Sequence, residues 1–154
     1  MTLALQKVLA PAAGSPERPE PGKFESRLNL DVVFTSVEPT LAALRKAAAL
    51  ASRLNARITL VVPQIVPYPL LLQTPPVLID FNERRFRIIA SQCPVAVTVR
   101  IYLCRDPAET LAGVLKPDSV VVLGGRRRWW PTAEKRLARK LRRVGHKVIF
   151  TETE

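Results

Sequence analysis

Residues 31–62, DVVFTSVEPTLAALRKAAALASRLNARITLVV, contain the pattern of a strand, a helix and a second strand. The apolar, β-branched run over residues 28–34 predicts a strand that ends in a turn at Thr35 and Ser36. From Glu38 onward, apolar residues recur at spacings of three and four, as on one face of an amphipathic helix; these residues are Leu41, Leu44, Ala48, Ala51 and Leu54. The unit therefore has the order in which many α/β domains begin.

The rest of the chain repeats this alternation of strands and helices. Pro63 is expected to end the second strand because proline cannot donate to a sheet ladder. Asp106 is expected to cap the helix that follows it, and Gly145 to end the last helix. Continuous apolar strands joined by helical crossovers predict an α/β fold with a five-stranded parallel sheet and helices on both faces. The further strands are expected at residues 56–62, 95–103, 119–123 and 147–151, and the further helices at 77–90, 107–115 and 131–144.

The length of 154 residues suits a single domain. Residues 11–23, PAAGSPERPEPGK, concentrate proline, glycine and charge and carry too little apolar material to pack into a core. We therefore expect a disordered N-terminal segment over residues 1–27 and one folded domain over residues 28–154.

Neither a membrane span nor a secretion signal is expected. Residues 58–79 carry no charge over a length that can cross a bilayer, but five prolines would break a helix there. The N-terminus has Lys7 in the middle of its apolar stretch, which argues against a signal peptide. Cys93 and Cys104 show neither the spacing of a zinc site nor that of a disulfide framework. These features predict a cytoplasmic protein.

The net charge of +11 is concentrated in residues 126–147, which contain ten basic residues and one acidic residue. At the start of this segment, residues 118–132 read DSVVVLGGRRRWWPT. A turn that follows a buried strand and opens a helix suits an anion, because backbone N–H groups, a helix N-terminus and cations can all face it.

Three segments together resemble the universal stress proteins in their order and spacing: the opening unit, CRDPAETL at 104–111 and SVVVLGGRRRWW at 119–130. The resemblance extends over residues 29–152. It implies the strand order 3-2-1-4-5, in which the winding reverses between the first and the fourth predicted strand. The turn at Thr35–Ser36 and the glycines Gly124–Gly125 would then flank one crevice.

The chain departs from the ATP-binding pattern of that family. ATP-binding members place an aspartate at the end of the first strand, where this chain has Thr35. Their loop after the fourth strand reads glycine, two residues, glycine, nine residues, then glycine with serine or threonine. Here Gly124 matches the first glycine, but Arg127 replaces the second, and Leu137 and Ala138 replace the final pair. Glycine admits the close approach of phosphate, whereas arginine adds a Cβ and a long side chain, so the family's mode of holding ATP is not expected.

Arginine can still hold a phosphate through its planar donor fork. Two interpretations therefore stay open: a ligand-free domain, or one that binds a nucleotide or another phosphate-bearing ligand without a required cofactor. The residues predicted to contact that ligand are Thr35, Ser36, Gly124, Gly125, Arg126, Arg127 and Arg128.

The first functional hypothesis is a binding or regulatory domain, not an enzyme, that forms a homodimer through its last strand as many relatives do. The alternative is nucleic-acid or polyanion binding, in which arginines neutralise phosphates and tryptophans stack on bases. An acidic protein surface would fit the same charge, and the tryptophans can instead anchor the loop or fill an interface. The residues of this alternative are Trp129, Trp130, Arg136, Arg139 and Arg143.

No catalytic or metal-binding set emerges from the sequence. His146 has no serine or cysteine close to it in sequence, which favours a structural role. No carboxylate is placed to hold Mg²⁺, which disfavours a phosphoester hydrolase. We expect both cysteines to be buried as small hydrophobes. The dispersed aspartates are expected to serve as caps and turn residues; these are Asp31, Asp80, Asp106 and Asp118.

Overall fold

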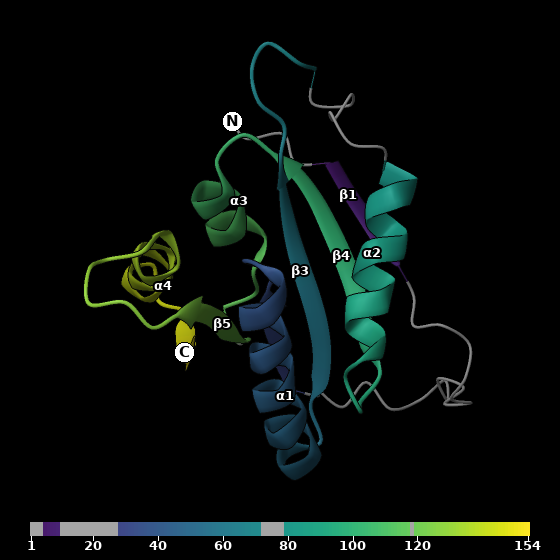
Figure 1. The fold of residues 1–154 in the computed structure, drawn as a ribbon, viewed down its shortest axis with the longest axis vertical. Helices are drawn as coiled ribbons and strands as arrows, with labels where there is room; N and C mark the ends of the chain where they lie inside the picture. Colours follow the sequence, from purple (N-terminus) through teal and green to yellow (C-terminus); the bar gives the residue numbers. More distant parts are fainter. Residues whose placement is uncertain (1–4, 10–27, 72–78, 118) are drawn as a thin grey trace.

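The computed structural model describes residues 5–9, 28–71, 79–117 and 119–154. In this part of the chain, one six-stranded sheet carries four helices (Figure 1). The strands are β1 (Leu5–Leu9), β2 (Asn29–Val33), β3 (Arg57–Ile65), β4 (Val97–Cys104), β5 (Val120–Arg126) and β6 (Lys147–Thr153). The helices are α1 (Val37–Leu54), α2 (Ile79–Ser91), α3 (Pro107–Val114) and α4 (Ala133–Arg143).

The sheet has the order β1-β4-β3-β2-β5-β6, and the five strands from β4 to β6 are parallel. These five strands, numbered along the chain, have the predicted order 3-2-1-4-5, so the expected fold class is confirmed. The winding reverses between β2 and β5, whose carboxyl ends lie side by side.

The sixth strand, β1, was not predicted. It pairs antiparallel with β4, with Leu5 opposite Leu103 and Leu9 opposite Val99. The expectation of a disordered N-terminal segment therefore does not hold for these five residues. A sheet edge presents unpaired N–H and C=O groups that a short neighbouring segment can satisfy without contributing to a core. The rest of the predicted segment, residues 1–4 and 10–27, lies outside the described residues.

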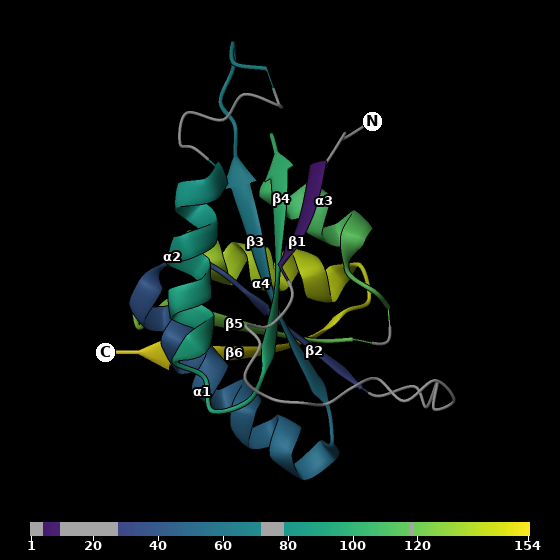
Figure 2. The same cartoon turned by 90° about the vertical axis from the view of Figure 1, so that its right-hand side faces the viewer.

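Helices cover both faces of the sheet (Figure 2). On one face, α1 and α2 pack on a core that includes Leu60 and Val99, and on the other face α3 and α4 pack on Val33 and Leu123. The alternation of side chains along each buried strand supplies both cores, which is why these strands read as continuous apolar runs.

Two predicted helix-end residues are confirmed. The Asp106 carboxylate accepts from the backbone N–H groups of Ala108 and Glu109 at 3.0 and 3.4 Å, as the cap of α3. Gly145 follows α4 with a φ of 100°, a left-handed conformation that glycine adopts readily. The helix predicted over residues 131–144 is shorter than expected, because Thr132 caps its start and Val144, which is 60% exposed, is its C-cap.

Two strands run further than expected. β3 continues through Pro63 to Ile65. The N–H of Val66 donates to the carbonyl oxygen of Cys104 in β4. Successive residues of a strand direct their backbone nitrogens to alternate sides, so the nitrogen of Pro63, three residues earlier, faces β2. Because β2 has already ended at that level, the missing proline N–H breaks no ladder bond. β5 likewise continues through Gly124 and Gly125 to Arg126 instead of turning at the glycines. None of the helices in the described ranges has the length and hydrophobicity needed to span a bilayer.

Gly124 of β5 and Gly113 of α3 provide a matched test of this packing. In Gly124→Ala the new Cβ would collide with the backbone carbonyl of Pro39 at the start of α1, and we expect a loss of about 1–3 kcal/mol in unfolding free energy. In Gly113→Ala the Cβ would meet no atom within 4 Å, and we expect a gain of up to about 1 kcal/mol. Urea unfolding of both variants checks this; equal effects would contradict the close approach of α1 to β5.

Candidate functional site

The sequence predicts a phosphate ligand at the carboxyl ends of β2 and β5. Thr35, just after β2, donates its hydroxyl to the carbonyl oxygen of Gly124 at 2.8 Å, and its backbone N–H donates to Thr40 Oγ1 at 3.1 Å. The structure therefore brings Thr35 and Gly124 together, but it uses both donors of Thr35 within the protein.

The two glycines of β5 serve close packing. Gly124 lies against the Pro39 backbone, and a Cβ on Gly125 would lie 2.6 Å from the Phe150 ring. Both glycines are buried and pair with β6, so they belong to the sheet and not to an open loop. Their small size is required by these helix and ring contacts.

The segment between β5 and α4 is short. Arg127 N–H donates to Thr153 O at 2.7 Å, and Thr132 caps α4 by accepting from Lys135 N–H at 3.3 Å. The positions of the family's final glycine pair, Leu137 and Ala138, consequently lie inside α4, where Ala138 is buried. At these two positions the backbone is helical.

The side chains of this segment lie at the surface. Arg126 forms an ion pair with Glu38 of α1 at 3.4 Å, with both side chains more than half exposed. Ser36 occupies the N-cap position of α1, is exposed, and makes no side-chain cap bond. Arg127 and Arg128 are exposed as well. The three arginines at 126–128 are thus exposed next to the contact between Thr35 and Gly124.

These arginines continue into the outer side of α4. Three arginines of α4 are exposed at spacings of three and four along the helix: Arg136, Arg139 and Arg143. No acidic side chain among the described residues forms an ion pair with them. Together with residues 126–130 they form what we call the basic surface.

Lysine contacts hold the basic surface in place. Lys135 donates to Arg128 O at 2.6 Å and pairs with Glu152 at 3.4 Å. The Arg128 guanidinium lies 5.2 Å from the centre of the Trp130 ring, a cation–π distance. Trp129 meets Trp130 edge to face at 5.5 Å and is itself 92% exposed. Trp129 therefore does not anchor the loop on the sheet.

The remaining candidates from the sequence lie in the interior. Cys104 is buried, as expected, and its burial raises the pKa of its thiol. Cys93 is half-buried beside the core. His146 is buried at the start of β6, and its Nδ1 has no hydrogen-bond partner among the described residues. Within those residues, no group of three histidine, cysteine or acidic side chains could hold a metal ion.

One predicted aspartate role is wrong. Asp31 is not a turn or cap residue, because it is the third residue of β2 and only 7% exposed. Its place inside the apolar run LNLDVVF is the signal in the sequence that indicates its burial. Asp118 and the side chain of Asp80 lie outside the described residues.

Comparison with known proteins identifies the fold. No protein-family model matches the sequence, and no curated protein matches it. A universal stress family protein from Burkholderia pseudomallei has a similar structure, with 19% sequence identity, a TM-score of 0.56, and coverage of 82% of this chain and 97% of that chain. The universal stress protein from Archaeoglobus fulgidus in complex with dAMP shows 14% identity, a TM-score of 0.57, and coverage of 80% and 96%. A universal stress protein in complex with cAMP shows 15% identity, a TM-score of 0.54, and coverage of 82% and 98%.

The contact between the carboxyl ends of β2 and β5 can be tested at Thr35. In Thr35→Val the carbonyl of Gly124 loses its hydroxyl donor, and we expect unfolding free energy to fall by about 1–3 kcal/mol. The matched control is Thr153→Val, because the Thr153 hydroxyl lies 3.4 Å from Gly125 O, beyond the usual O–H···O distance. That variant should lose less than about 0.5 kcal/mol in the same urea titration. A Thr35→Val protein as stable as wild type would show that this hydrogen bond does not stabilise the contact between the ends of β2 and β5.

Proposed function

Because this chain has the fold of the universal stress proteins, we propose that it is a non-catalytic binding domain that does not hold ATP in the family's mode. Its ligand, in this proposal, is a phosphate-bearing polyanion, such as single-stranded nucleic acid, that contacts the basic surface. The observation that carries the proposal is Trp129, a 92% exposed indole placed beside three exposed arginines.

The dimensions of the basic surface suit a short stretch of single strand. The positions from Arg136 to Arg143 cover seven helical steps, about 10 Å. That distance matches roughly three nucleotides at about 3.4 Å per step. Arg126 extends the same charge toward the end of β5, although its pairing with Glu38 reduces its contribution.

The tryptophans add the second element of single-strand recognition. A base can stack on an aromatic face, and such stacking contributes about 1–3 kcal/mol per base. Trp130 is held by its edge-to-face contact and by Arg128, which leaves Trp129 free to accept a base without reorganising the loop. Cations and a stacking platform thus lie together at one surface.

Salt dependence tests the polyanion proposal. We expect binding of a fluorescent oligothymidine to weaken as salt rises, because bound arginines release counterions from the strand. Replacing Arg136, Arg139 and Arg143 with glutamine should flatten the slope of log K against log salt by about 2. Fluorescence anisotropy over a series of salt concentrations measures both slopes.

A control of equal charge separates specific contact from net charge. Lys46→Gln, Arg53→Gln and Arg84→Gln remove three exposed cations from α1 and α2, and this combination should leave the slope unchanged. Trp129→Ala should weaken binding by about 1–3 kcal/mol, whereas Phe81→Ala, which removes an exposed aromatic ring on α2, should not. No binding at low salt, or equal losses in both triple variants, would refute the proposal.

A mononucleotide at the crevice between β2 and β5 is the second candidate. It is favoured by the solved universal stress proteins that carry dAMP and cAMP. In this chain, the arginine side chains of residues 126–128 would replace the family's glycine backbone as phosphate donors. Both donors of Thr35 are already used within the protein, so they would have to exchange partners to contact the nucleotide.

Thermal shift distinguishes this candidate from the first. A mononucleotide at about one hundred times its dissociation constant should raise the melting temperature by ~5–10 °C. Arg126→Gln, Arg127→Gln and Arg128→Gln together should abolish the shift, while the α4 triple variant should keep it. If ATP, ADP, AMP, cAMP and inorganic phosphate all leave the melting temperature unchanged, the mononucleotide candidate is wrong.

We also propose that the chain forms a homodimer through β6. Among the described residues, β6 lies at an end of the sheet and pairs with β5 alone. Thr153 O accepts from Arg127 of the β5 side, so the N–H of Glu152 points to the open edge. An open edge can pair with the same strand of a second copy around a two-fold axis.

Light scattering after gel filtration tests the dimer. We expect wild type to show twice the chain mass of 17.1 kDa and Glu152→Pro to show the single mass, because proline removes an N–H from the pairing edge. Glu152→Gln, which keeps that N–H, should remain dimeric. A wild-type protein at 17.1 kDa would contradict the proposal.

A further inference from the structure

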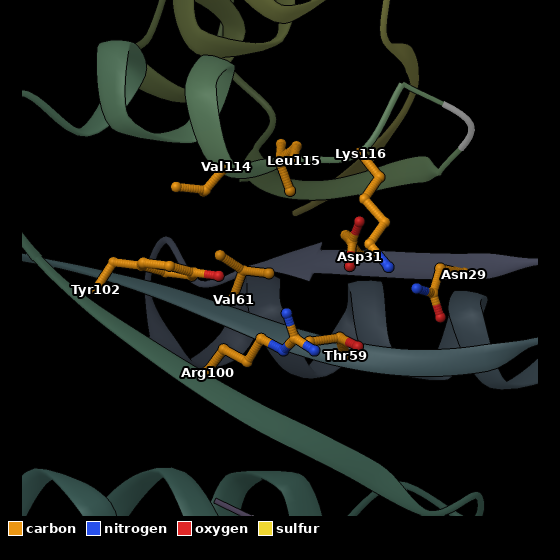
Figure 3. Close-up of a pocket in the computed structure, with 9 residues that line it drawn as sticks. All are labelled: Asn29, Asp31, Thr59, Val61, Arg100, Tyr102, Val114, Leu115 and Lys116. Carbon is orange, nitrogen blue, oxygen red and sulfur yellow. The ribbon is translucent and has the colours of Figure 1, made fainter. Parts of the chain in front are cut away.

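A second polar site lies at the amino ends of the parallel strands, whereas Thr35 and Gly124 lie at the carboxyl ends. A cavity of ≈ 30 Å³ opens on the face that carries α3 and α4, at the amino ends of β2 and β3 (Figure 3). Asp31 precedes Thr35 by four residues, about 13 Å along an extended chain. The polar residues that line the cavity are Asn29, Asp31, Thr59, Arg100 and Lys116.

The end of α3 forms one wall of this cavity. The helix ends at Val114, and Leu115 packs into the core, so both residues line the cavity together with Lys116. Lys116 then projects over the opening, and Arg100 reaches it from β4. Figure 3 shows the polar ends of Asp31, Lys116 and Arg100 turned into the same space.

The charged side chains that line the cavity have a net positive charge. Arg100 and Lys116 are cationic, and Asp31 has the one carboxyl group among the lining side chains. The Nε of Arg100 is buried and has no hydrogen-bond partner among the described residues. A buried donor without a partner is costly, and an acceptor placed in the cavity would remove that cost.

Burial of Asp31 raises the pKa of its carboxyl group above the ordinary value of 3.8. Several groups oppose this effect: the Ser119 hydroxyl, before β5, by a hydrogen bond, and Arg100, Lys116 and His146 by their charges. Thr59 of β3 and Asn29 of β2 face the same cavity as neutral groups. Desolvation exceeds the combined attraction of these partners, so the neutral carboxyl is favoured relative to an exposed aspartate.

We infer that this cavity binds a small oxyanion, a carboxylate or bicarbonate, which accepts from Arg100 and Lys116 while Asp31 takes up a proton from solvent. The size agrees, because a cavity of this volume accommodates about two or three waters, close to the volume of formate. The residues are separate from the basic surface, so this inference does not depend on the proposed polyanion function.

Proton uptake determines how affinity changes with pH. A bound anion beside Asp31 raises the pKa of that carboxyl group further, because like charges disfavour the ionised form. The affinity for the oxyanion therefore falls by up to about tenfold per pH unit over one range of pH. That range lies between the pKa of Asp31 in the free protein and the pKa of Asp31 in the complex.

The experiment uses ¹⁵N-labelled full-length protein and follows the Arg100 Nε–H resonance, assigned by its absence in Arg100→Gln. Sodium formate is titrated at several values between about pH 5.5 and about pH 7.5, with sodium chloride at equal ionic strength as the reference. We expect a saturable shift with formate alone, and weaker binding as pH rises. In Asp31→Asn the binding should be tighter at neutral pH and independent of pH.

Three further measurements decide the outcome. Arg100→Gln should abolish formate binding, and Lys116→Gln, at an exposed position that does not threaten folding, should weaken it about tenfold. The α4 triple glutamine variant should bind formate as wild type does. The inference is overturned if no saturable shift occurs, if chloride gives the same shift, or if Lys116→Gln binds formate unchanged. It is also overturned if folded Asp31→Asn protein keeps the pH dependence of wild type.

Discussion

The close contact between the start of α1 and the end of β5 governs the arrangement of this domain. Gly124 has no side chain, so the Pro39 backbone lies directly against it, and the Thr35 hydroxyl donates to the Gly124 carbonyl. This contact joins β2, α1 and β5 at the point where the winding of the sheet reverses. In open α/β sheets that point usually leaves a crevice for a ligand. In this chain, residues of all three elements are held together beside that point by backbone packing and one hydrogen bond.

The fold and the surface charge of this chain are separate features. The chain has the strand order and helix placement of the universal stress proteins. Its α4 begins directly after a short segment, and Leu137 and Ala138 pack toward the core from that helix. The exposed arginines lie in the segment with the two tryptophans and along α4. Fold alone does not determine the ligand, because the site depends on individual side chains.

The two ends of the parallel strands differ in their polar groups. At the carboxyl ends, the hydroxyl and the backbone N–H of Thr35 are satisfied within the protein, and the charged side chains of Arg126 and Glu38 are exposed. At the amino ends, Asp31 and Arg100 lie around a small cavity, and the guanidinium has a buried donor without a partner among the described residues. Buried groups interact more strongly than exposed ones because water screens them less. Small ligands are therefore more consistent with the cavity at the amino ends, and large polyanions with the exposed basic surface.

Much of the fold follows from local patterns in the sequence. The spacing of Leu41 and Leu44, the cap at Asp106 and the glycine at 145 determined helices and their ends, because these depend on neighbouring residues along the chain. The parallel order of five strands followed from their alternation with helices and from the family resemblance. The concentration of charge in α4 was equally visible, since an exposed helix face needs no long-range partner.

The tertiary structure decided whatever depends on contacts between distant segments. Pro63 remains in a strand only because β2 ends beside it, and Leu5–Leu9 form a strand only because β4 offers an open edge. The identity of Gly124 suggests a turn, whereas its place in β5 against the Pro39 backbone is visible only in the structure. Asp31 interacts with side chains more than sixty residues away along the chain. Local propensity depends on adjacent residues, but burial, pairing and electrostatic environment depend on which segments the fold brings together, and no short window of sequence contains that information.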